Sequence, residues 1–185
     1  MVLKDMEDIR QKADCLRSEQ EVEEALSRMA REIAERLAGS DPVAFCIMNG
    51  GLFVTGKLVD KLPFALELDY LHATRYGAEM FGGNLLWKVK PERSLKGRTV
   101  LLIDDILDEG VTLAEITKYC REEGAAEVYT AVLVDKIHDR KAPGAKADFV
   151  GLEVEDRFLF GCGMDIAGYW RNLPALYAMK EQNEQ

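Results

Sequence analysis

The sequence predicts an α/β fold: a mainly parallel, twisted sheet flanked by helices. Three runs rich in β-branched and aliphatic residues, 43–48, 99–103 and 128–134, are typical of strands buried on both faces. Stretches of helical length follow the first two runs, so strands and helices alternate. Ligand sites of such sheets lie at the carboxyl ends of the strands, where we expect the functional residues.

The N-terminal region, residues 1–40, is charged and is predicted to be helical. Ser18 and Glu21 have the spacing of a capping box, which would begin a helix that Gly39 ends. One face of this helix is apolar and would cover the sheet. That face consists of Val22, Leu26, Met29, Ile33 and Leu37.

The remaining elements follow from periodicity and from breaks in it. A helix is expected over 52–62 and a strand over 64–71. Residues 72–84 hold three glycines and no periodic pattern, which is typical of a flexible loop or a lid. Extended structure resumes over 85–89, and a last helix is expected over 173–180.

The composition excludes several classes of protein. The 185 residues are 48% hydrophobic, enough for one core, so a single domain is expected. No run approaches the roughly 20 apolar residues of a membrane span, and the first residues hold no apolar signal region. The cysteines have no zinc or CxxC spacing. With a net charge of −9, we expect a cytoplasmic protein that binds neither membranes nor nucleic acid.

The most informative segment begins where the central apolar strand reaches two adjacent carboxylates, Asp104 and Asp105. Gly110 permits a tight turn in which successive N–H groups can surround an anion. Thr112 and Glu115 have capping-box spacing and predict a helix start. Carboxylates beside an amide-lined helix start suit a ligand that carries phosphate, divalent metal and vicinal hydroxyls. We therefore interpret the segment as a binding site rather than a solvated acidic turn.

Two other patterns are weaker. Residues 51–57 nearly match a nucleotide-binding P-loop, but Leu58 stands where Ser or Thr would hold magnesium, so we treat the match as accidental. The turn 49–51 has two glycines that would let the backbone close on an anion, although an ordinary strand-to-helix turn is the alternative. His72 and His138 have no metal-ligand spacing and are expected to be solvent-facing loop residues.

The segment 99–112 resembles the phosphoribosyl-pyrophosphate (PRPP) signature of type I phosphoribosyltransferases, and more narrowly of the hypoxanthine-guanine branch. Segments 48–51, 68–77 and 148–171 carry the resemblance further and occur in the same order. It implies one domain over residues 1–185, with a lid loop at 72–84 and a purine-binding hood at 148–172. It also implies purine salvage: Mg²⁺-dependent transfer of phosphoribose from PRPP to a six-oxopurine base, by a homodimer or homotetramer.

The resemblance also implies roles for individual residues. Those assigned to PRPP and its 5′-phosphate are Asp104, Asp105, Asp108, Glu109, Gly110, Val111 and Thr112. Asp108 would also be catalytic, sharing a proton with the purine N7. Pyrophosphate would contact Asn49, Gly50 and Arg171, with a cis peptide bond between Met48 and Asn49. The purine would meet Lys136 at its six-position oxygen, Phe158 by stacking and the backbone of Leu159. The residues assigned to metal are Asp104, Asp105 and Asp165, and those assigned to the lid are Arg75 and Tyr76.

Three positions depart from the family pattern. Asn49 stands where many relatives carry lysine, and Glu109 where they often carry serine or threonine. Arg75 replaces a small residue and would either reach the pyrophosphate or stay solvated. A xanthine-preferring enzyme is one alternative. A nucleotide-sensing regulator that binds nucleic acid is another, disfavoured by the negative charge and by the retained Asp108, Phe158 and Lys136.

Overall fold

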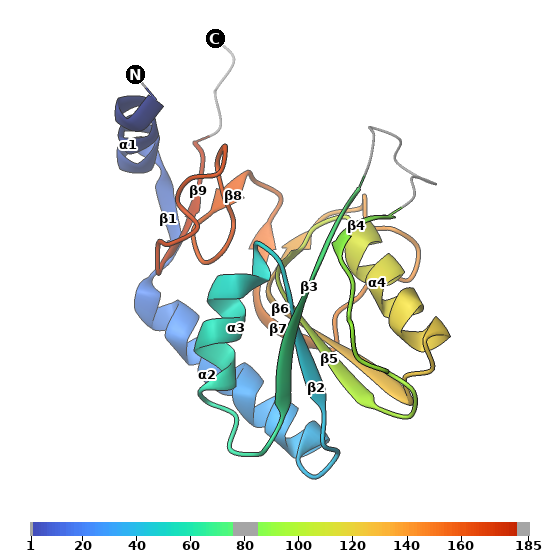
Figure 1. Ribbon diagram of the computed structural model, residues 1–185. Coiled ribbons are helices and arrows are strands. Elements are labelled where there is room, and N and C mark those ends of the chain that lie inside the picture. Colours follow the sequence, from blue (N-terminus) through green and yellow to red (C-terminus); the bar gives the residue numbers. More distant parts are fainter. Residues whose placement is uncertain (1, 76–84, 181–185) are drawn as a thin grey trace.

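In the computed structural model, residues 2–75 and 85–180 are described, and their centre is a six-stranded sheet (Figure 1). The strand order is β4-β3-β2-β5-β6-β7. Only β3 and β4 pair antiparallel, so the predicted fold class, a mainly parallel α/β sheet, is confirmed. The strands are β2 (Val43–Ile47), β3 (Glu67–Arg75), β4 (Leu85–Val89), β5 (Thr99–Leu107), β6 (Glu127–Ile137) and β7 (Phe149–Glu155).

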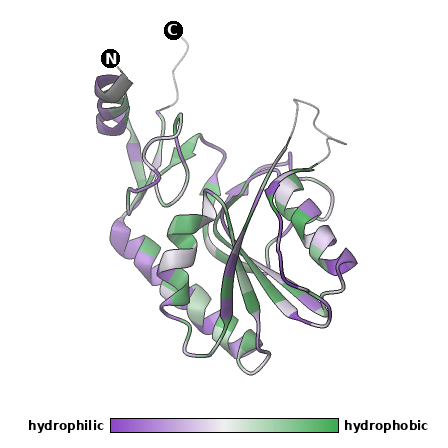
Figure 2. Cartoon of the chain, viewed as in Figure 1, coloured by the Kyte–Doolittle hydropathy of each residue, from purple (hydrophilic) through white to green (hydrophobic). Residues whose placement is uncertain are grey.

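Helices cover both faces of this sheet. Helices α2 (Glu19–Leu37) and α3 (Gly51–Val59) pack on one face, and α4 (Val111–Glu122) packs on the other (Figure 1). The apolar residues of β5 alternate between the two resulting cores, with Leu101 and Ile103 in one and Val100 and Leu102 in the other. Figure 2 shows the apolar residues gathered on the strands and on the helix faces turned toward them. None of the helices within the described ranges is both long and apolar enough to cross a membrane.

Helix α2 follows its sequence pattern closely. The Ser18 backbone N–H donates to the Glu21 carboxylate at 2.8 Å, and the Glu21 backbone N–H donates to the Ser18 hydroxyl at 3.3 Å. The predicted capping box is therefore confirmed, and it supports the first turn of the helix. All five residues of the predicted apolar face are buried. The helix ends at Leu37, shortly before Gly39, whose φ is +84°.

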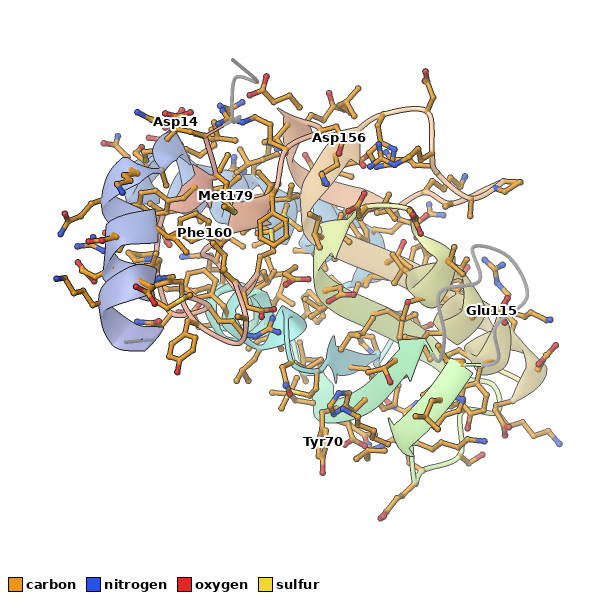
Figure 3. All side chains as sticks on the ribbon, turned by 90° about the horizontal axis from the view of Figure 1, so that it is seen from above. Asp14, Tyr70, Glu115, Asp156, Phe160 and Met179 are labelled. Atoms are coloured by element: carbon orange, nitrogen blue, oxygen red, sulfur yellow. The ribbon has the colours of Figure 1, made fainter. Side chains whose placement is uncertain are left out.

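A second, three-stranded antiparallel sheet lies at one end of the molecule, with strand order β1-β9-β8 (Figure 1). Its strands are β1 (Asp14–Arg17), β8 (Leu159–Phe160) and β9 (Leu176–Ala178), and helix α1 (Val2–Lys12) precedes it. Seen from above, Phe160 and Met179 lie on the opposite side of the molecule from Glu115 of α4 (Figure 3).

This small sheet corrects two predictions. Residues 1–40 are not helical throughout, because β1 interrupts them, and residues 173–180 contain strand β9 instead of a helix. The physical reason is tertiary pairing: β9 hydrogen-bonds to β1 and β8, which overrides the local helix propensity of its residues.

Several element boundaries also differ from those predicted. Strand β5 runs on to Leu107 because it stays paired with β6, so the two acids lie inside the strand. Residues 72–75, predicted to belong to the lid, continue β3 in pairing with β4, and 76–84 lie outside the described residues. The segment 148–172, whose role as a hood stays a prediction, contains the edge strand β7. Helix α4 begins at Val111 after Gly110, so the predicted capping box at Thr112 is wrong.

Candidate active site

A pocket of about 350 Å³ opens at the carboxyl ends of the central strands. Its walls come from the ends of β2 and β5, from Ala73 of β3 and from the first turn of α4. All seven residues that the sequence assigned to PRPP line it: Asp104, Asp105, Asp108, Glu109, Gly110, Val111 and Thr112. The volume lies in the range of small-molecule sites, so one continuous segment supplies most of a ligand-sized pocket.

The two acids of β5 lie in direct contact, Asp105 buried and Asp104 half-buried. The backbone N–H of Asp105 donates to Asp104 Oδ1 at 3.0 Å, and Asp105 is 7% exposed. Burial raises the pKa of Asp104 well above its usual value, and the neighbouring charge of Asp105 adds to the rise. Burial also raises the pKa of Asp105, although the positive charge of Arg171 acts in the opposite direction. Burial and like charge thus disfavour ionisation of the two acids, and a bound cation would favour it.

The turn after β2 packs against this acid pair. The peptide bond between Met48 and Asn49 is cis, as the resemblance implied. A Cβ on Gly50 would lie 2.1 Å from Asp105 Oδ2, and a Cβ on Gly163 would lie 2.2 Å from the Gly50 carbonyl oxygen. Because no side chain fits at either glycine, three segments distant in sequence meet at the acid pair.

Arg171 and Asp165 lie in the third of these segments. Arg171 Nη1 donates to the Gly163 carbonyl oxygen at 2.6 Å, and its Nη2 forms an ion pair with Asp165. Asp165 also accepts a hydrogen bond from the backbone N–H of Gly168 at 2.6 Å. These contacts hold a guanidinium near the acids of β5, where its charge opposes the rise in their pKa values.

The loop between β5 and α4 is braced from behind. Gly110 has a φ of +77°, and a Cβ there would lie 2.5 Å from the Ala145 Cβ. The Ala142 backbone N–H donates to the Glu109 carbonyl oxygen at 2.8 Å. Since the first N–H groups of a helix have no partner within it, the start of α4 offers donors for an anion.

By contrast, the P-loop-like residues 51–57 lie within helix α3, so that match is accidental.

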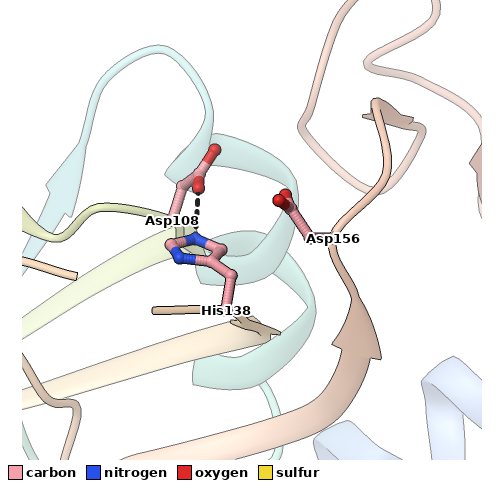
Figure 4. A group of neighbouring side chains, drawn as sticks. All are labelled: Asp108, His138 and Asp156. Atoms are coloured by element: carbon pink, nitrogen blue, oxygen red, sulfur yellow. Dashed lines mark hydrogen bonds and ion pairs between the residues drawn. The ribbon is translucent and has the colours of Figure 1, made fainter. Parts of the chain in front are cut away.

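A cluster of charged side chains adjoins Asp108, just beyond the end of β5. Lys136 Nζ lies 3.1 Å from Asp108 Oδ2 and 2.9 Å from Asp156 Oδ1. Arg140 pairs with Asp156, and Arg140 and Lys136 together hold the pKa of the Asp156 carboxyl well below its usual value. His138 Nε2 lies 2.7 Å from Asp108 Oδ1 (Figure 4).

His138 therefore corrects the prediction of a solvent-facing loop residue. Its side chain is only 4% exposed because β6 ends at Ile137 and the next residue turns in against Asp108. The other histidine, His72, lies in β3, paired with Val89 of β4. A position just past the end of a sheet strand was the only sequence signal that could have pointed to His138.

The residues predicted to bind the purine are Lys136 of the charged cluster and two residues close in sequence to Asp156. Lys136 of β6 is 7% exposed, Leu159 of β8 is 6% exposed, and Phe158 is 56% exposed. The Leu159 side chain belongs to the core, whereas the Phe158 ring is open to a partner. Of the predicted lid residues, Arg75 ends β3 and Tyr76 lies outside the described residues.

The pocket joins paired acids of a parallel strand to an amide-lined turn, the arrangement that the sequence predicted for PRPP. Residues 13–167 match the family described as the phosphoribosyl transferase domain, and the chain belongs to that family. The chain is 32% identical over 164 residues to hypoxanthine-guanine phosphoribosyltransferase of Bacillus subtilis (strain 168), covering 88% of this chain and 91% of the relative. It is 32% identical over 179 residues to the Aquifex aeolicus (strain VF5) protein of the same name, covering 95% and 100%.

Solved structures agree with these relatives. A hypoxanthine-guanine-xanthine phosphoribosyltransferase superposes with a TM-score of 0.82 at 27% identity, covering 91% of this chain and 97% of the other. A hypoxanthine phosphoribosyltransferase from Staphylococcus aureus shares the fold, with a TM-score of 0.87 at 23% identity and coverage of 95% and 96%. The predicted family, the hypoxanthine-guanine branch of the type I phosphoribosyltransferases, is confirmed.

Proposed function

We propose that this protein transfers the 5-phosphoribosyl group from PRPP to N9 of hypoxanthine or guanine, forming IMP or GMP and releasing pyrophosphate. One observation carries the proposal: a single pocket joins the acid pair of β5, the amide-lined start of α4 and Asp108. Asp108 in turn contacts Lys136, the residue expected to recognise the base. The residues proposed to recognise the sugar, the phosphate and the base thus lie next to one another.

The acid pair is the proposed site of the Mg²⁺–PRPP complex. Asp104 and Asp105 are adjacent carboxylates whose ionisation is disfavoured by burial, and hard divalent cations prefer such oxygen ligands. They would contact the ribose hydroxyls or the water shell of the metal, with Asp165 acting through water. When bound, Mg²⁺ would neutralise charge on the leaving pyrophosphate. Asn49, Gly50 and Arg171 would hold the pyrophosphate, with Arg171 supplying planar N–H donors.

The start of α4 is the proposed cradle for the 5′-phosphate. N–H groups from Glu109 to Thr112, together with the Thr112 hydroxyl, would surround the phosphate oxygens. The carbonyl of Glu109 is tied to Ala142, so the backbone of this loop is held in place without the ligand. A braced loop loses little conformational entropy when phosphate binds.

The cluster around Asp108 is the proposed base-recognition and proton-transfer site. Lys136 would donate to the six-position oxygen, Phe158 would stack on the base, and the Leu159 backbone would meet its exocyclic edge. Asp108 would accept the N7 proton as N9 bonds to C1′ and the bond between C1′ and pyrophosphate breaks. Arg75 and Tyr76 would help to exclude water, because water would otherwise hydrolyse PRPP. A homo-oligomer also stays a prediction.

A steady-state assay with PRPP and Mg²⁺ tests the proposal. Hypoxanthine, guanine, xanthine and adenine are compared as acceptors, and turnover with the first two is expected. Asp108→Asn should lower kcat by about 10²–10⁴-fold, the usual contribution of general acid–base catalysis, with little change in the KM for PRPP. Asp139→Asn, which removes an exposed carboxylate from the neighbouring loop, is the matched control. Absence of turnover with every base would contradict the proposal, and a preference for xanthine would favour the alternative specificity.

A further inference from the structure

The feature that the proposed function leaves unexplained is His138. Its side chain is 4% exposed, and its Nε2 lies 2.7 Å from Asp108 Oδ1 (Figure 4). We infer that His138 is a positioning residue for the transfer reaction, holding one oxygen of Asp108 so that the other receives the purine proton. This inference rests on the proposed function, because it assigns work to the carboxylate through which that function acts.

The second ring nitrogen of His138 fixes which nitrogen carries the proton. The backbone N–H of Arg140 donates to His138 Nδ1 at 3.0 Å. Nδ1 is therefore an acceptor, so the neutral ring carries its hydrogen on Nε2 and donates it to Asp108 Oδ1. Accepting a proton from Asp108 would require a bare Nε2 and a protonated Nδ1, which the Arg140 N–H opposes. His138 is thus a fixed donor rather than a proton relay.

The remaining oxygen, Asp108 Oδ2, has a partner that can leave. Lys136 Nζ lies 3.1 Å from Oδ2 but also 2.9 Å from Asp156 Oδ1. If Lys136 turns toward the six-position oxygen of a purine, it keeps Asp156 as a counterion while Oδ2 becomes open. The proton then passes from N7 to Oδ2, the N9 electron pair bonds to C1′, and the electron pair of the breaking C1′–oxygen bond leaves with pyrophosphate.

The same cluster does not carry a metal site. Ligand atoms of Asp108, His138 and Asp156 lie within 4.8 Å of one another, an arrangement that a cation can use. However, Lys136 and Arg140 already pair with these two carboxylates and balance their charge. The charges that face His138 therefore belong to a compensated network, in which the imidazole serves as a hydrogen-bond donor.

Two variants that differ by one methylene test the inference. His138→Gln places an amide N–H at the depth of Nε2, where it can still donate to Asp108. His138→Asn reaches only the depth of Nδ1, so it loses the contact with Asp108. Loss of a hydrogen bond to a charged group predicts that kcat of His138→Asn falls roughly 10- to 100-fold, while His138→Gln stays within about threefold of wild type. The KM for PRPP should stay unchanged in both, and in the Asp108→Asn background the His138→Asn change should have no further effect.

Each result supports or overturns the inference. Equal kcat values for the Asn and Gln variants would overturn it, whether both are active or both are impaired. A KM for PRPP that rises as far as kcat falls would show a structural role instead. If Asp108→Asn itself keeps wild-type kcat, the proposed role of Asp108 fails together with this inference. If Asp108→Asn is impaired but His138→Asn is not, only the role of His138 fails.

Discussion

The close approach of the Gly50 turn to Asp105 makes one substitution especially informative. In Gly50→Ala, the new methyl group would lie 2.1 Å from Asp105 Oδ2 and 2.6 Å from Oδ1. The backbone at Gly50 has a φ of −60°, which alanine adopts without strain, so the clash is the whole perturbation. Asp105 is 7% exposed, so its carboxylate has little free space into which it can turn.

The size of the effect follows from this geometry. The nearest oxygen must move by about 0.9 Å to restore a tolerable 3.0 Å separation. A misplacement of about 1 Å at a reacting centre can lower activity by roughly 10²-fold, so kcat/KM for PRPP should fall by 10- to 100-fold, or about one to two decades. Overpacking of this kind also costs about 1–3 kcal/mol, which lowers Tm by roughly 2–12 °C in a chain of this size.

Steady-state kinetics with varied PRPP, together with thermal unfolding, measure both effects. Gly56→Ala is the matched control, because Gly56 is exposed within helix α3 and a Cβ there meets nothing within 4 Å. That variant should keep full activity and gain about 0.5–1 kcal/mol of stability from the better helix propensity of alanine. Wild-type kcat/KM in Gly50→Ala would refute the idea that the position of Asp105 governs PRPP use.

Two further predictions concern titrating groups. Burial raises the pKa of Asp104 well above its ordinary value of 3.8, so the folded state binds this proton more tightly than the unfolded state does. The free energy of unfolding should therefore fall as pH rises between the unfolded-state and folded-state pKa values of Asp104. Asp104→Asn should flatten that slope and raise Tm at neutral pH, while it lowers turnover. The same dependence of Tm on pH in the wild type and the variant would contradict this. Burial also raises the pKa values of Cys120 and Cys162 to about 12 and that of buried Cys46 above its usual value, whereas Cys15 is exposed. Ellman's reagent at about pH 8 should label one thiol rapidly in the folded protein, and a second fast thiol would show that the buried sites open.

The sequence predicted best where local pattern and tertiary environment agree. The central strand 99–103 is aliphatic throughout, and in the structure it lies between two cores as such a pattern requires. The capping box of Ser18 and Glu21 is local by nature, and it forms as predicted. The seven residues predicted to bind PRPP are nearly contiguous, so placing one segment at the end of β5 brought them all to one pocket.

Prediction failed where distant segments decide the structure. Residues 176–178 favour a helix locally, but they pair with β1, more than 150 residues earlier in the chain, through a register such as Asp14 to Ala178. His138 has an unremarkable local sequence, and its contact with Asp108 forms because β5 and β6 lie side by side in the sheet. Such contacts depend on sheet topology, which periodicity alone does not reveal.

The central claim is that the start of α4 holds the 5′-phosphate beside the acid pair of β5. A crystal structure of the protein with IMP tests it most directly. We predict that the phosphate lies against the backbone N–H groups of residues 109–112, with the ribose hydroxyls facing Asp104 and Asp105 and the base beside Lys136. A phosphate bound elsewhere, with this loop free of ligand at saturating IMP, would contradict the account.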